Sequence, residues 1–283
     1  MLKTKLIHIN SIQIVAFLGF FLFSCTISKK NDELILLRLT PEVGSVYEIS
    51  TNMNIALDMK QPININMEFF IKTVYDSVLS NGDFAITSEI SRVKAIMSSG
   101  IFHKSYDTEH PVLESDIEKE LHKKLSKIID VKFNGSINSI GETEGKTNLD
   151  SLFKGDEQMK EQFEEIQKSF SNGGVVFPKE SVKKGSVWNR KIENLENQNM
   201  TQKINYKVKK ITPKEVFIDI SGVISYGSKD VTGGGKIKGT MKLHRNTGIN
   251  KFSRINQDYK MDINGYKATG VNTIEVKSEL IEN

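Results

Sequence analysis

The chain has little cysteine: Cys25 is the only one among 283 residues. A single thiol forms no intramolecular disulfide, and it does not supply the paired cysteines of a zinc site. The stability of the folded chain must therefore come from packing. Hydrophobic residues make up 38% of the sequence, which is enough for a packed core and argues against a disordered chain.

The sequence also lacks the short motifs that carry catalytic or cofactor chemistry. It contains no Gly-x-Ser-x-Gly elbow, no His-Glu-x-x-His pair, no phosphate loop and no calcium loop. The histidines after the leader are His103, His110, His122 and His244, and none lies three or four residues from another. We therefore predict no catalytic residue, no cofactor and no metal site. A hydrolase stays the remote enzymatic alternative, because a pair of acids in a cleft leaves no linear pattern.

Charge of one sign is not concentrated anywhere along the chain. The net charge is +4, with 39 basic and 35 acidic residues. A nucleic-acid-binding protein usually gathers its lysines and arginines in one patch. The interleaved charges therefore argue against a nucleic-acid partner.

A strong pattern is present at the N-terminus. Lys3 and Lys5 precede an apolar run over residues 12–23, and Ser24 then precedes Cys25. This is the layout of a secretory signal with a small residue before the cleavage point. The run is shorter than the ~20 apolar residues that a membrane-spanning helix needs. A plain cleaved signal and a membrane anchor are the two alternatives to a lipidated protein.

The segment Leu22-Phe23-Ser24-Cys25 resembles the lipobox of bacterial lipoproteins. The resemblance implies cleavage before Cys25, lipidation of this cysteine and acylation of its amino group, for example with palmitate. It therefore implies a membrane partner, held through the lipid anchor. Thr26 rather than Asp implies the outer membrane of the cell envelope, on its periplasmic face or at the cell surface. The polar residues 25–33 are expected to form a flexible tether.

Alternating apolar and polar residues dominate the first half of the body. They predict strands over residues 34–39, 63–71 and 84–90, and a long strand region that opens at Val43 and alternates from Met53 to Met59. Helical spacing follows: Ser115 and Glu118 match a capping box, and apolar residues recur up to Ile128. Asn134-Gly135 is expected at the tip of a short hairpin. A second helix is expected over residues 147–172, which end at a glycine pair.

The second half is predicted to be almost entirely strands. The candidates are residues 200–211, 216–225, 236–244, 249–259 and 268–280. Residues 228–235, which include three consecutive glycines, are expected to form a turn between two of these strands.

These patterns predict a β-rich α+β fold: long antiparallel strands in a curled sheet, with two covering helices. The expected organisation is a signal peptide at 1–24, a tether at 25–33, an N-terminal β-rich half at 34–145, a helical connector at 146–174 and a C-terminal β half at 175–283. Three sequence matches suggest that the halves are related. They pair Gly44 with Gly185, Phe84 with Phe217, and Ile137 with Ile249.

The whole layout resembles uncharacterised envelope lipoproteins of Bacteroidota, with the lipobox ahead of long alternating strands and Phe177-Pro178 ahead of Gly185-Ser186-Val187-Trp188. The resemblance implies a location and no activity. Our first hypothesis is a non-catalytic envelope lipoprotein that binds an apolar ligand or a partner protein. The alternative is a surface module that captures glycan or protein, with Tyr47 and Trp188 as ligand contacts. Ser77 and Ser151 match the O-glycosylation pattern Asp-Ser-apolar of exported Bacteroidota proteins.

Overall fold

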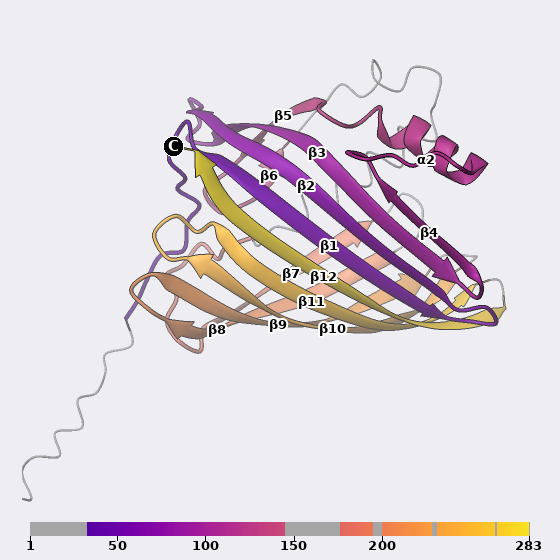
Figure 1. Cartoon of the computed structure of the whole chain (residues 1–283). Coiled ribbons are helices and arrows are strands. Elements are labelled where there is room, and N and C mark those ends of the chain that lie inside the picture. The colour runs from indigo at the N-terminus through magenta and orange to yellow at the C-terminus, as the bar shows by residue number, and fades with distance from the viewer. Residues whose placement is uncertain (1–32, 145–175, 195–199, 228–230, 264, 283) are drawn as a thin grey trace, which may run out of the picture. The chain divides into compact units, whose positions relative to one another are not determined.

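The computed structural model describes residues 33–144, 176–194, 200–227, 231–263 and 265–282. The chain divides into two units, Met1–Glu33 and Leu34–Asn283. All described strands and the one described helix belong to the second unit (Figure 1). Both hydrophobic cores belong to it as well.

The elements follow in chain order as β1 (Val46–Asp58), β2 (Ile63–Val78), β3 (Phe84–Ser99), β4 (Phe102–Asp107), α2 (Asp116–Leu125), β5 (Lys132–Ile137), β6 (Thr143–Glu144), β7 (Val187–Asn194), β8 (Met200–Ile211), β9 (Glu215–Gly227), β10 (Val231–His244), β11 (Asn250–Ile263) and β12 (Tyr266–Glu282). The predicted long strands are confirmed, and strand β8 has the predicted bounds.

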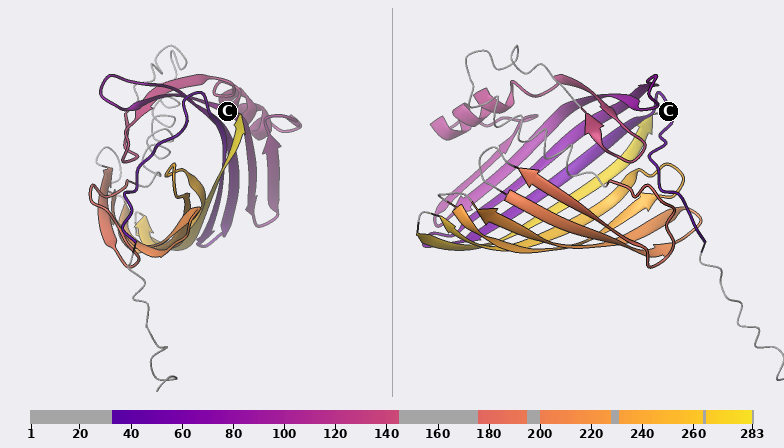
Figure 2. Two further views of the ribbon diagram at one scale, coloured as in Figure 1. Left: turned by 90° about the vertical axis from the view of Figure 1, so that its left-hand side faces the viewer. Right: turned by 180° about the vertical axis from the view of Figure 1, so that it is seen from behind.

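All strands belong to one antiparallel sheet, ordered β6-β5-β3-β2-β1-β12-β11-β10-β9-β8-β7, with β4 also paired to β3. The sheet is open and curls on itself (Figure 2). The pairing of β1 with β12 joins the N-terminal and C-terminal strands, through partners that run from Val46–Glu282 to Asp58–Thr269. The curled antiparallel sheet of the prediction is therefore confirmed.

The main core lies inside the curl. It brings residues from β8, β9 and β10 together with Tyr75 of β2, so these side chains mark the concave face of the sheet. Leu37 and Leu39 are part of it, with 0% and 6% of their surface exposed. The apolar run over residues 34–39 was expected to be a strand. It makes only one isolated bridge, between Ile35 and Val182, because its leucines insert into the core instead.

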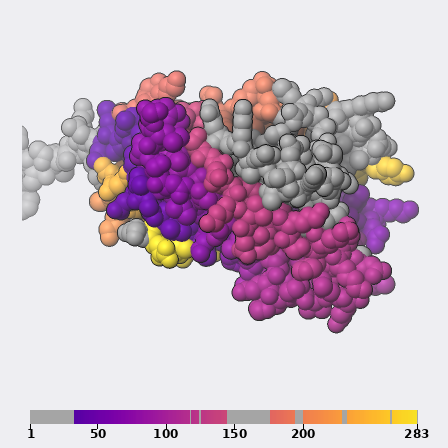
Figure 3. Space-filling view, turned by 90° about the horizontal axis from the view of Figure 1, so that it is seen from above, coloured from indigo at the N-terminus to yellow at the C-terminus, as the bar shows by residue number. Residues whose placement is uncertain are grey.

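The predicted pair of covering helices is not confirmed. The described residues contain one short helix, α2, and the helix expected over residues 147–172 lies outside them. The capping box of α2 is present as predicted, with Ser115 and Glu118 each accepting from the other's backbone N–H. Ile128, just past the helix, is buried in a second core with strands β2 and β3. In space-filling view, the magenta segment of β4 and α2 stands out from one side (Figure 3).

The glycine run at 233–235 lies inside strand β10, so the predicted turn was wrong over these residues. A methyl group on Gly235 would come within 1.9 Å of the carbonyl oxygen of Asp258 on β11. Such close approach of two strands tolerates only glycine. On the other side of Tyr259, a methyl group on Gly270 would lie 2.4 Å from the tyrosine ring. These glycines accommodate the bend of the sheet.

The predicted hairpin around Asn134-Gly135 was also wrong. Both residues lie within β5, where they pair with Thr87 and Ile86 of β3. The chain turns later, after Asn138, whose backbone N–H donates to the carbonyl of Glu142 (2.9 Å).

The two halves open with the same hydrogen-bond pattern. The backbone of Tyr75 exchanges two hydrogen bonds with Gly44–Ser45, of 2.7 and 3.1 Å. The backbone of Val208 exchanges two with Gly185–Ser186, of 2.8 and 2.9 Å. Both glycines have a positive φ, +88° and +87°. Strands β1 and β7 therefore start from equivalent turns.

A β-bulge follows at the next position in both halves, at Asp76 in β2 and at Lys209 in β8. Each bulge side chain contacts the same place on the following strand. Asp76 accepts a hydrogen bond from Thr87 (2.7 Å), and Lys209 pairs with Asp219 (3.2 Å). Shared bulges are specific features of a fold, so they support related halves.

These equivalences shift two of the three sequence matches. Phe84 corresponds to Val216, one residue before the expected position. Ile137, which pairs with Phe84, corresponds to Leu243, which pairs with Val216. Strands β4 and β5 together thus take the place of β10, with α2 inserted between them. The geometry supports the hypothesis of two related halves.

Candidate binding face

The concave face of the sheet carries almost no charge. Side chains alternate between the two faces of each strand, and the ladder partners show which residues share a face. Across β1, β2, β3 and β8 to β12, no charged residue of the described strands points to the concave face. Two cations stand at its borders, Lys104 on β4 and Arg190 on β7.

The concave face changes character across the sheet. Over β8, β9 and β10 it is covered by the main core, which includes Ile204, Ile224 and Ile237. Beside the cores, on β1, β2, β3 and β12, it presents aliphatic and methionine side chains that are only partly buried, which we call the Met/Ile patch: Met53, Ile55, Ile65, Met67, Met97 and Ile274. Met97 keeps 43% of its surface exposed. Met53 stands opposite Met67 on β2 and opposite Ile274 on β12.

Methionine suits a surface that has to fit an irregular apolar partner, because its side chain is unbranched and polarisable. Partly exposed apolar residues that adjoin one another usually mark an interaction site. The Met/Ile patch is therefore our candidate for ligand binding.

One transverse row of the concave face crosses ten strands. Its members are Lys104, Met97, Ile65, Ile55, Asn272, Gln257, Ile237, Gly222, Ile204 and Arg190. The two cations occupy its ends and two amides occupy its centre. The Nδ2 of Asn272 donates to the Oε1 of Gln257 (3.2 Å). The row thus places a hydrogen-bonded pair of neutral amides between apolar neighbours on both sides.

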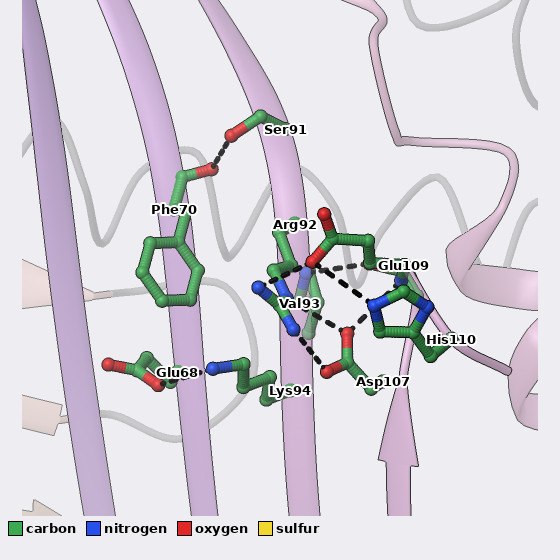
Figure 4. Close-up of polar contacts among 10 residues, drawn as sticks. Glu68, Phe70, Ser91, Arg92, Val93, Lys94, Asp107, Glu109 and His110 are labelled. Atoms are coloured by element: carbon green, nitrogen blue, oxygen red, sulfur yellow. Dashed lines mark hydrogen bonds and ion pairs between the residues drawn. The ribbon is translucent and has the colours of Figure 1, made fainter.

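The outer face carries a cluster of ion pairs over β2, β3 and β4 (Figure 4). Arg92 forms two parallel hydrogen bonds to the carboxylate of Asp107, of 3.0 and 2.6 Å, and a further ion pair with Glu109. Hydrogen bonds from the Arg92 guanidinium hold the pKa of Asp107 below its ordinary value. This geometry ties strand β4 to strand β3.

Phe70 lies between two cations of the same cluster. The Arg92 guanidinium is 5.9 Å and the Lys94 ammonium is 5.2 Å from the ring centre. Lys94 also pairs with Glu68 at 3.7 Å. Each cation already has an acid partner. We therefore interpret the cluster as a contact that ties neighbouring strands together rather than as a reactive site.

The two aromatics predicted as ligand contacts pack against the main core. The ring of Tyr47 meets Tyr75 edge-on at 5.8 Å. Trp188 stacks on Tyr206 at 5.3 Å, and its indole N–H donates to the carbonyl of Val176 (2.9 Å). Both are partly buried. They do not form an exposed aromatic cluster, and they pack against the main core rather than lie in the Met/Ile patch.

The other predicted sites gain little from the structure. Ser77 is exposed near the end of β2, and its modification stays a prediction. Cys25 and Ser151 lie outside the described residues. Within the described ranges, no group of three or more His, Cys, Asp and Glu is arranged to hold a metal ion. In the same ranges, no helix has the length and apolar character to span a membrane.

Residues 81–250 match a family model described as a family of unknown function, DUF6263. The match covers more than half of the chain. The chain belongs to this family. None of the curated proteins compared with it matches. Membership brings no activity with it, so any function has to be argued from the site.

The sequence alone predicted the apolar strand residues of this candidate face. The alternation of Met53, Ile55, Ile65 and Met67 is visible in the sequence and gives their shared face. It missed the amide pair, because Asn272 and Gln257 become neighbours only through the register of β11 and β12. A polar residue within an otherwise apolar alternation is the one signal that points to them.

Proposed function

We propose that the protein is a non-catalytic, lipid-anchored envelope protein that binds the acyl chain of an apolar ligand on the Met/Ile patch. The observation that carries this proposal is the uncharged concave face. Ligand sites are mostly apolar with few polar groups, which matches the patch and its neighbouring amides. The proposal involves no catalytic residue, metal or cofactor.

The proposal places the protein at the outer membrane, through a lipid on Cys25 and the tether that follows. It is supported by the leader at 1–24, which ends in a small residue directly before the single cysteine of the chain. The periplasmic face and the cell surface are both compatible with it. Capture of a glycan by Tyr47 and Trp188 is favoured less, because both rings pack against the core.

The binding proposal is tested with the unit Leu34–Asn283, which contains every described strand and both cores. The probe is the fluorescent dye N-phenyl-1-naphthylamine, displaced by methyl laurate. Ile55→Glu puts a charge into the patch and should lower the affinity for the dye and for methyl laurate by roughly tenfold or more, because a charge next to an apolar ligand loses its hydration.

Asn54→Glu is the matched control. Asn54 is the neighbouring residue on the outer face and is exposed, so this variant should bind like the native unit. Thermal unfolding of both variants checks that the sheet is intact. Equal binding by the native unit and the folded Ile55→Glu variant, or no binding of either ligand to the native unit, would remove the acyl-chain proposal and leave a protein partner as the better reading.

A further inference from the structure

The amide pair at the centre of the ten-strand row is incompletely hydrogen-bonded. The Oδ1 of Asn272 is shielded from solvent and has no hydrogen-bond partner. The pair makes one internal hydrogen bond, which uses the Nδ2 of Asn272 and the Oε1 of Gln257. Among the described residues, no partner is found for the Nε2 of Gln257 either. The pair therefore keeps one unused acceptor, the buried Oδ1 of Asn272, and one unused donor, the Nε2 of Gln257, on residues that are ladder partners.

An unpaired polar atom in an apolar setting lowers the stability of the fold. One explanation is a bound water molecule. The position of the pair beside the Met/Ile patch favours a ligand instead. Ile55 of the Met/Ile patch stands directly opposite Asn272, and Ile65 and Met97 continue the row outward. From Asn272 to Met97 the row covers three strand spacings, or roughly 14 Å.

We infer that Asn272 and Gln257 recognise the polar end of the bound ligand, and that this end is a neutral group that both accepts and donates a hydrogen bond, such as an amide. This inference rests on the proposed function and names the ligand class: an uncharged amphiphile. Its acyl chain lies across β1, β2 and β3 along the Met/Ile patch. Its carbonyl accepts from Gln257, and its N–H donates to Asn272.

Charge decides against an anionic headgroup. The row has cations only at its two ends, each four strands from the nearer amide. Lys104 is already paired with Glu118 at 3.1 Å, and Arg190 is not free. A carboxylate or phosphate beside Asn272 would thus be buried without a counter-charge, which is strongly unfavourable.

The test compares three ligands with the same twelve-carbon chain, lauramide, methyl laurate and laurate, in dye displacement from the Leu34–Asn283 unit. The amide should bind about tenfold more tightly than the ester, which accepts but does not donate. The laurate anion should bind most weakly. Asn272→Leu should remove the advantage of the amide while it keeps or improves binding of the ester.

Asn256→Leu is the matched control, because Asn256 pairs with Thr273 on the outer face (2.9 Å). It should leave the preference unchanged. If Asn272→Leu fails to fold, Gln257→Met removes the donor of the pair and should weaken the amide and the ester alike, because both carbonyls accept from the Nε2 of Gln257. Equal affinity for amide and ester, or tightest binding of laurate, overturns this inference and leaves acyl-chain binding standing. Absence of binding by all three ligands overturns the proposed function as well.

Discussion

A methyl group at position 235 has no space in the native sheet. The Cβ of an alanine there would lie 1.9 Å from the carbonyl oxygen of Asp258, a backbone atom that moves only with its strand. We expect Gly235→Ala to lower the free energy of unfolding by about 1–3 kcal/mol, the range for overpacked interiors. Urea unfolding followed by circular dichroism measures it.

Gly227→Ala is the control for this substitution. Gly227 pairs with Thr232 at the far end of β9 and β10, and a methyl group there would meet no atom within 4 Å. Its stability should stay within about 0.5 kcal/mol of the native value. Similar losses of unfolding free energy in both variants would show that the close approach of β10 and β11 does not explain the effect of Gly235→Ala.

At the scale of elements, α2 is held to strand β4 by an acid-sensitive contact. Glu118 is 6% exposed. Its carboxylate accepts from the N–H of Ser115 (2.8 Å) and from the ammonium of Lys104 (3.1 Å). Hydrogen bonds from the Ser115 backbone, followed by that from Lys104, lower the pKa of Glu118 to about 2.

Because the folded pKa lies below the unfolded value of about 4.3, ionised Glu118 stabilises the fold above that pH, and the contribution is lost as the pH falls toward 2. We expect the unfolding free energy of the native protein to drop more steeply between pH 5 and pH 2 than that of Glu118→Gln, which keeps a capping side chain but no charge. Parallel pH profiles for the two proteins would contradict this account of α2.

Element prediction succeeded where the signal is local. The bounds of β8 were predicted correctly because Ile204, Tyr206 and Val208 alternate with lysines and other polar residues, and they are buried as expected. It failed where a distant strand decides the structure. The glycine run of β10 looks like a turn in the sequence, but the curl of the sheet requires glycine within the strand.

At the scale of the whole molecule, the decisive contacts lie far apart in the chain. The first and last described strands in chain order, β1 and β12, pair along the whole length of β1. No local pattern predicts that pairing, and the row from Lys104 to Arg190 depends on nine successive registers. The candidate face was therefore predictable as apolar strand faces, whereas its amide centre required the three-dimensional structure.

The proposed placement at the outer membrane depends on Cys25, which lies outside the described residues. If Cys25 is lipidated, cells grown with labelled palmitate should yield a labelled native protein in the outer-membrane fraction. Cys25→Ser should incorporate no label, because the thioether needs the thiol, and it should leave that fraction or keep its leader. A single acyl chain holds a protein at a membrane only marginally, and several chains hold it firmly. Loss of all the acyl chains on residue 25 should therefore be visible in fractionation.

Thr26→Ala serves as the control, since it changes the neighbouring residue and keeps the thiol. It should label and fractionate like the native protein. All described strands begin after residue 45, so neither substitution should alter thermal unfolding of the body. A native protein that takes up no palmitate, or a Cys25→Ser protein that is labelled equally, would contradict the anchor. Acyl-chain binding by the concave face would then have to be explained for a protein that is not held at a membrane by this cysteine.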